Sequence, residues 1–142
     1  MIIKFFNYIR MNQKPILAEI SVGELIDKIT ILQIKDKFIQ GPNRIIVQKE
    51  LSILTDALMT QVLVDETVQT FTNELKAVNQ SLWDIEDAIR ICEKQKDFGD
   101  TFIELARSVY KTNDRRADLK KKINVHVGSN IAEVKSYEDY ES

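Results

Sequence analysis

Residues 67–96 carry apolar side chains at alternating spacings of three and four positions, and few folds can use such a run. Its members are Phe71, Leu75, Val78, Leu82, Ile85, Ile89 and Cys92. This spacing keeps them on one face of an α-helix, as in helical bundles and coiled coils. A similar run between Asp100, the expected N-cap, and Gly128, the expected stop, predicts a second long helix, with Thr112 and Arg116 as polar members of its seam. Because only a short segment separates the two helices, we expect an antiparallel hairpin.

Capping signals place two more helices ahead of this hairpin. Ser21 with Glu24 three residues later forms a capping box, which predicts a helix from there to about residue 40. Gly41 followed by a proline ends that helix, and Asn43 is the expected N-cap of another over roughly residues 44–64. The chain is therefore predicted to be all-α, an antiparallel bundle of about four helices in two hairpins. A homodimer could complete its core, because helices of about 30 residues are long for so small a monomer.

The composition excludes several classes of protein. Hydrophobic residues make up 44% and charged residues 30% of the 142 residues, as in a single folded domain. Four glycines and two prolines are too few for the many turns of a β-sandwich. One cysteine and one histidine exclude a disulfide framework and cysteine- or histidine-rich metal sites. The net charge of −2 gives no general attraction for nucleic acid, so we expect no nucleic-acid partner.

The two ends differ from the helical domain, which we expect to span residues 15–130. Residues 1–14 form an N-terminal extension with an apolar start, which a lysine and an asparagine interrupt well short of the ~20 residues that span a membrane. Since no cleavage site follows, we expect neither a signal peptide nor a membrane anchor, and a cytoplasmic location. This start either packs on the domain, which we favour, or lies apart from it. Residues 131–142 form an acidic tail that Tyr137 and Tyr140 could hold against the domain.

Polar and aromatic side chains border the apolar seams instead of lying opposite them. The rows are Asn79, Trp83, Glu86 and Arg90 in the third helix, Glu24, Lys28, Ile31 and Lys35 in the first, and Tyr110, Asn113, Ala117, Lys120 and Asn124 in the last. One interpretation is a solvated boundary, on which Glu24 would pair with Lys28, and Glu86 with Arg90. The other is that the rows face one another across a polar groove. Asn, Trp and Tyr favour the groove, because Lys, Glu and Ala would form a solvated helix face more readily.

Such a groove would bind an anionic small molecule, for example a sugar phosphate or a nucleotide. Trp83, unless it is simply a packing residue, and Tyr110 would stack on a sugar or a base, while basic side chains would bind phosphate or carboxylate. The expected ligand-binding residues are Lys28, Asn79, Trp83, Arg90, Arg107, Tyr110, Asn113 and Asp114. If the protein is an enzyme, a question that the sequence leaves open, Glu86 or Glu24 is the expected general acid/base.

Carboxylates and basic residues suggest two further kinds of site. The carboxylates form two pairs, Glu24 with Asp27 and Glu86 with Asp87. Oxygen ligands suit Mg²⁺, but the acidic cluster that accompanies such pairs in helical pyrophosphohydrolases is missing. We therefore expect no metal ligands, identify no cofactor, and expect Asp27 and Asp87 to pair with Lys28 or Arg90.

The basic residues of positions 107–122 point to several faces of their helix and indicate a solvated surface.

Three blocks of the sequence resemble a family of short uncharacterised helical proteins from bacteria and viruses, known only as a domain of unknown function. The blocks are SVGELIDKITIL at 21–32, NxxLWxIEDxIR at 79–90 and LARSVYxxNDxRA at 105–117, within a similarity over about residues 15–137. The resemblance implies no established activity. Members often lie near glycosyltransferase genes, which implies a link to carbohydrate or sugar-nucleotide metabolism. The alternative to a small-molecule site is therefore a non-enzymatic interaction or homodimerisation module, as an accessory to a glycosyltransferase.

Overall fold

A computed structural model describes residues 14–140 of the chain, and it is all-helical. The helices are α2 (Val22–Phe38), α3 (Pro42–Gln61), α4 (Glu66–Gln95) and α5 (Asp100–Val127). The described part of the chain contains no strand, and consecutive helices pair as α2 with α3 and α4 with α5. The all-α prediction and the two hairpins are therefore confirmed. The prediction for the start of the chain falls largely on residues 1–13, which lie outside the described residues.

The helix boundaries follow the capping signals, with two corrections. Ser21 Oγ accepts a hydrogen bond from the Glu24 backbone N–H at 3.2 Å, as the capping box predicts. The N-cap of α3 is Gly41 instead of Asn43, because the proline after Gly41 has no N–H to satisfy and is suited to the first helical position. In α5 the N-cap is Gly99, and Asp100 is already helical, where its charge favours the positive end of the helix.

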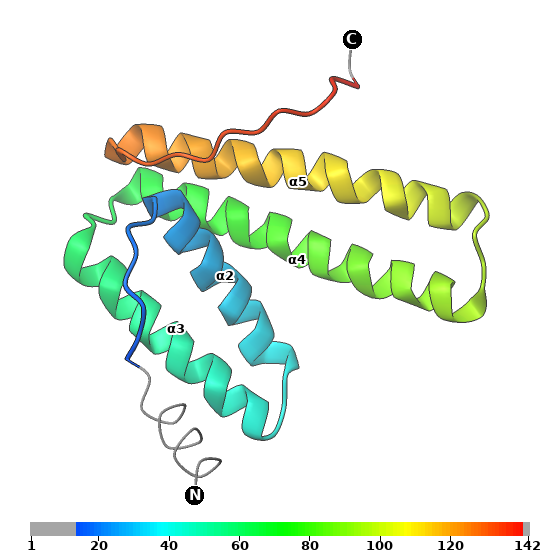
Figure 1. Cartoon of the computed structure of the whole chain (residues 1–142), viewed down its shortest axis with the longest axis horizontal. Coiled ribbons are helices and arrows are strands. Elements are labelled where there is room, and N and C mark those ends of the chain that lie inside the picture. The colour runs from blue at the N-terminus through cyan, green and yellow to red at the C-terminus, as the bar shows by residue number, and fades with distance from the viewer. Residues whose placement is uncertain (1–13, 141–142) are drawn as a thin grey trace, which may run out of the picture.

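The two hairpins cross instead of running parallel (Figure 1). α4 and α5 form one long antiparallel pair, and α2 lies across one half of it. α3 packs against α2, and within residues 14–140 its backbone comes close to neither α4 nor α5. The other half of the long pair, toward the α4–α5 loop, extends past α2 and α3 (Figure 1). The two hairpins therefore overlap along only half of the α4–α5 pair. A corner forms where the C-terminal end of α2 meets the middle of α4.

The apolar core is concentrated where α2 lies on the long hairpin. Ile26 of α2, Val68 and Leu75 of α4, and Ile123 of α5 are fully buried and belong to one cluster. Burial of each such side chain contributes about 1.5–3 kcal/mol to stability. Beyond Val78 the α4 seam is half-buried at Leu82, Ile85 and Ile89, and it is buried again at Cys92.

Gly23 allows α2 to approach α5 closely. Its backbone N–H donates to Asn124 Oδ1 at 2.7 Å, and both residues are buried. A Cβ at this position would lie 2.5 Å from the Lys120 backbone carbonyl oxygen and 2.9 Å from Asn124 Oδ1. The absence of a side chain therefore sets the distance between the two helices, and with it the position of polar side chains on α2 relative to α5.

After Gly128 the chain turns back and follows α5 without regular secondary structure (Figure 1). Tyr140 donates a hydrogen bond from its hydroxyl to Asp114 Oδ2 at 2.7 Å, and its ring contacts Tyr110 edge-on at 5.1 Å between centroids. Tyr140 thus holds the tail as expected, whereas Tyr137 is 76% exposed. None of the helices found over residues 14–140 is both long and apolar enough to cross a membrane.

Candidate functional site

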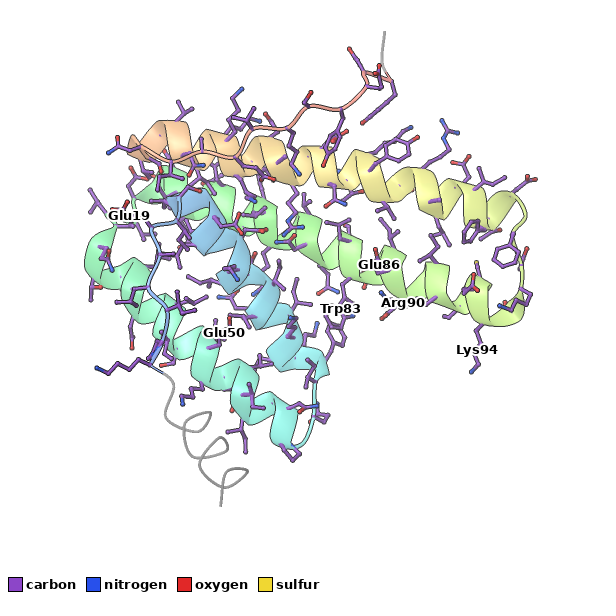
Figure 2. All side chains as sticks on the ribbon, viewed as in Figure 1. Glu19, Glu50, Trp83, Glu86, Arg90 and Lys94 are labelled. Atoms are coloured by element: carbon purple, nitrogen blue, oxygen red, sulfur yellow. The ribbon has the colours of Figure 1, made fainter. Side chains whose placement is uncertain are left out.

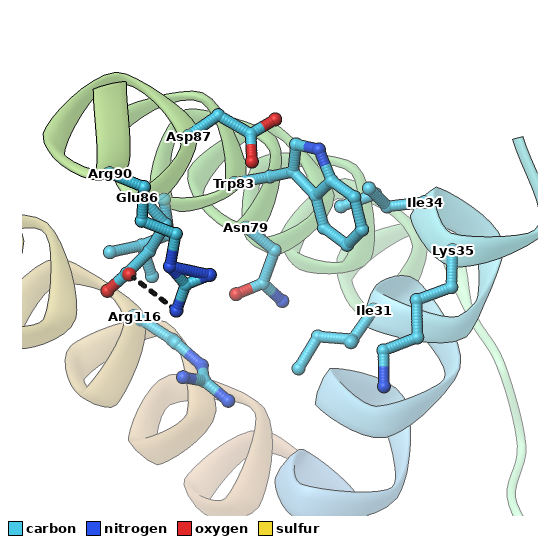
Figure 3. A pocket seen from close by; sticks show the side chains of 10 residues that line it. Ile31, Ile34, Lys35, Asn79, Trp83, Glu86, Asp87, Arg90 and Arg116 are labelled. Atoms are coloured by element: carbon cyan, nitrogen blue, oxygen red, sulfur yellow. Dashed lines mark ion pairs between the residues drawn. The ribbon is translucent and has the colours of Figure 1, made fainter. Parts of the chain in front are cut away.

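A pocket of about 360 Å³ lies at the corner between the two hairpins (Figure 3). Its lining residues are Ile31, Ile34, Lys35, Asn79, Leu82, Trp83, Glu86, Asp87, Arg90 and Arg116. We call it the Trp83 pocket. It contains the complete polar row that the sequence indicates on α4, two members of the α2 row, and one arginine from α5. Three of the four helices therefore meet at this pocket, although its α5 residue, Arg116, is not a member of the expected α5 row.

Trp83 is fixed in place by the end of α2. Its indole stacks on the Phe38 ring with centroids 5.4 Å apart and an angle of 15° between the planes. Phe38 is the last residue of α2, so this contact ties the hairpins together at the corner. Figure 2 shows Trp83 beside this end of α2, with Glu86 and Arg90 farther along α4. Trp83 is thus a packing residue and a wall of the pocket at the same time.

Basic side chains approach the pocket from all three helices. In Figure 3 the guanidinium groups of Arg90 and Arg116 lie on one side of Asn79, and Lys35 lies on the other. Arg90 Nη2 is 3.4 Å from Glu86 Oε2, and the Arg90 side chain is 73% exposed. An ion pair this exposed contributes little to stability, so Arg90 can exchange Glu86 for another anion at small cost. Within residues 14–140, the Lys35 ammonium forms no ion pair with a carboxylate.

The floor of the pocket rests on a buried network that sequence reasoning did not foresee. Asp27 is fully buried and accepts hydrogen bonds from Arg116 Nε at 2.9 Å and from Asn79 Nδ2 at 2.8 Å. Arg116 Nη2 is also 2.5 Å from Asp27 Oδ2, which makes the pair bidentate. Asn79 Nδ2 donates in addition to Thr30 Oγ1 at 2.9 Å. The hydrogen bond to Asp27 raises the pKa of Arg116.

This network corrects the expected partner of Asp27. Asp27 pairs with Arg116 from α5 instead of with Lys28 or Arg90, since Lys28 is exposed and Arg90 pairs with Glu86. A neighbour in sequence cannot reach a fully buried carboxylate, whereas a side chain from a helix packed against it can. The signal in the sequence was Arg116 itself, the charged one of the two polar residues on the seam of α5.

A second, smaller pocket of about 240 Å³ lies between α2, α5 and the tail. Lys120 is its central cation: Nζ is 2.6 Å from Glu24 Oε2, 2.9 Å from Glu133 Oε2 and 4.0 Å from Asp27 Oδ2. The Lys120 side chain is only 9% exposed. Burial acts to lower the pKa of Lys120, but the hydrogen bonds to Glu24 and Glu133 and the negative charges of Glu24 and Asp27 together outweigh it, so the pKa is raised. We call this the Lys120 pocket.

The two carboxylates that are candidates for the general acid/base lie in different pockets. Glu86 lines the Trp83 pocket, whereas Glu24 lines the Lys120 pocket and is paired with Lys120 there. The expected pairing of Glu24 with Lys28 is therefore wrong, while that of Glu86 with Arg90 is confirmed at 3.4 Å. Of the two, only Glu86 is placed to contact a molecule bound beside Trp83.

The remaining expected site residues lie outside the Trp83 pocket. Arg107 pairs with Glu104 at 3.1 Å on the exposed side of α5. Tyr110 and Asp114 contact Tyr140 of the tail, and Asn113 lines the Lys120 pocket. The α5 row therefore contributes no residue to the Trp83 pocket: Lys120 and Asn124 contact α2, and Tyr110 contacts the tail. Among the described residues, no three side chains of His, Cys, Asp or Glu are grouped as a metal ion would require.

Comparisons with known proteins identify a family for the chain. No curated protein matches the chain. No solved structure matches it either. One family model matches residues 16–142, which include all four helices and the tail. The chain therefore belongs to a family of unknown function (DUF6165).

Proposed function

We propose that the protein binds an anionic small molecule with a ring, such as a sugar phosphate or a nucleotide, in the Trp83 pocket. The observation that carries the proposal is the meeting of an indole, two arginines and a lysine around one pocket of about 360 Å³. A pocket of this size suits a small ligand, and a few polar groups on an apolar lining are typical of such sites. Trp83, Arg90, Arg116 and Lys35 come from three different helices, so the site depends on the folded chain.

Each part of the proposed ligand has a matching group in the pocket. Trp83, held by Phe38, is a rigid flat surface for a sugar or a base. Arg90 and Lys35 are the cations best placed to bind phosphate, because neither has to give up a buried ion pair. Arg90 pairs only with the exposed Glu86, whereas Arg116 is held by the buried Asp27. Glu86, once released from Arg90, can accept hydrogen bonds from sugar hydroxyls, and it is the proposed acid–base group if the ligand is a substrate.

The test is a thermal-shift screen of sugar phosphates, nucleotides and sugar nucleotides, with and without Mg²⁺. A ligand that binds only the folded chain raises Tm by mass action. We expect a hit whose shift is lost in Trp83→Ala and Arg90→Ala. Arg107→Ala is the matched control, because Arg107 also pairs with a glutamate on its own helix but lies outside the pocket. A shift that persists in both pocket variants would reject the proposal.

A second candidate function is an interaction module, in which the chain binds a second copy or a partner enzyme such as a glycosyltransferase. The specific observation is the free end of the α4–α5 hairpin, where Ile91, Phe98 and Ile103 are 54%, 51% and 50% exposed. Sedimentation velocity over a range of concentrations tests the homodimer. We expect Ile103→Ser to abolish association if this surface is used, and a monomer at every concentration would exclude self-association.

A further inference from the structure

The Lys120 pocket contains a negative charge supplied by the chain itself. Glu133, on the tail, is 2.9 Å from Lys120 Nζ and 3.1 Å from Lys135 Nζ. The hydrogen bonds from Lys120 and Lys135 lower the pKa of Glu133, so it is present as a carboxylate. Two ammonium groups thus surround one carboxylate, as they would surround one phosphate group.

The charges around this pocket balance only while Glu133 is present. Three cations face three carboxylates: Arg116, Lys120 and Lys135 against Glu24, Asp27 and Glu133. Asp27 and Glu24 belong to α2, and they remain in place whatever the tail does. If the Glu133 side chain turns away while Lys135 stays in place, one positive charge beside an almost buried lysine is left uncompensated, which is costly unless another anion enters.

The tail can release Glu133 easily. The Glu133 side chain is 44% exposed, and the segment around it has no regular secondary structure. Within the described chain, no backbone–backbone hydrogen bond joins residues 130–138 to a helix. The contact between tail and pocket is therefore made by side chains, and the Glu133 carboxylate can be replaced without breaking any helix.

We propose that Arg116, Lys120 and Lys135 form a binding site for a phosphate group, and that Glu133 occupies this site as an internal competitor. A phosphate group has a larger charge and more acceptor oxygens than a carboxylate, so it can satisfy the same ammonium groups and also the Arg116 guanidinium. Asn113, which accepts a long hydrogen bond from Arg116 Nη1 at 3.5 Å, can turn its amide toward the same anion. This site is separate from the Trp83 pocket, although Arg116 lines both.

The experiment is a titration of the full-length protein with inorganic phosphate, followed by the NMR amide signals of Asn113, Ala117 and Lys120. An internal competitor that fills its site about nine-tenths of the time weakens binding about tenfold. We therefore expect Glu133→Gln to tighten phosphate binding by about that factor, and Lys135→Gln in the same background to remove the gain. Both substitutions are on the surface of the tail and leave the helices intact.

Glu138→Gln is the matched control, because it removes one negative charge from the same tail at an exposed position outside the pocket. We expect it to bind phosphate as the unaltered protein does. Equal tightening in Glu133→Gln and Glu138→Gln would mean a general charge effect and would overturn the proposal, as would no phosphate binding in Glu133→Gln. Arg90→Ala separates this proposal from the ligand site at Trp83, because it should leave phosphate binding in the Lys120 pocket unchanged.

Discussion

At the scale of single residues, the most consequential contact is the one between Arg116 and Asp27. The arginine was visible in the sequence as a charged member of an apolar seam, but its partner is 89 residues away. Neither spacing nor composition identifies a partner at that distance, because it depends on how α2 crosses α5. The sequence could therefore indicate that position 116 is special without indicating what it contacts.

We predict that Arg116→Ala destabilises the protein by about 3–5 kcal/mol, because it leaves the fully buried Asp27 carboxylate without its main partner. Arg107→Ala should cost about 0.5 kcal/mol or less, because the Arg107–Glu104 pair is exposed. Urea unfolding of both variants measures the difference. Asp27→Asn in the Arg116→Ala background should recover part of the lost stability. Equal stabilities of Arg116→Ala and Arg107→Ala would show that the buried pair does not stabilise the fold.

At the scale of helices, the sequence predicted most of what is observed. Ser21 caps α2 and Gly128 ends α5, since both signals depend only on local backbone geometry. The predicted N-caps at Asn43 and Asp100 were wrong by one or two positions. Proline and aspartate both suit the first turn of a helix, so each helix starts at its earliest permitted residue. The close approach of α2 to α5 was not predicted, because Gly23 looked like an ordinary residue of the capping box.

Gly23 gives the prediction at this scale. Alanine normally stabilises a helix relative to glycine by about 1 kcal/mol. Here the added Cβ would lie 2.5 Å from the Lys120 carbonyl oxygen, so we predict that Gly23→Ala destabilises by about 1–3 kcal/mol through overpacking. Gly99→Ala is the comparison: its Cβ would meet only Asp97 Oδ1, at 3.3 Å, so we expect it to cost less than Gly23→Ala, mainly the preference for glycine over alanine at an N-cap. Thermal unfolding that shows Gly23→Ala to be as stable as the unaltered chain would refute the tight contact.

At the scale of the whole molecule, the crossing of the hairpins creates the candidate site. The polar rows on α2 and α4 were predicted from helical periodicity, and they do meet at the Trp83 pocket. The row on α5 lines no part of that pocket, because its Lys120 and Asn124 contact α2 elsewhere and its Tyr110 contacts Tyr140 of the tail. Periodicity identifies the face of each helix on which polar residues lie. It does not determine the angle between hairpins or the path of a tail, and these decide which faces meet.

The central claim is that a ring-bearing anion binds against Trp83, and the protein offers a direct probe because this is its one tryptophan. We would titrate the chain with the ligand found by thermal shift and record intrinsic tryptophan fluorescence. The account predicts a saturable change in the fluorescence, with a Kd equal to that from calorimetry, and its loss in Arg90→Ala but not in Arg107→Ala. A ligand that binds by calorimetry and leaves the fluorescence unchanged would contradict it, because such a ligand would lie elsewhere on the molecule.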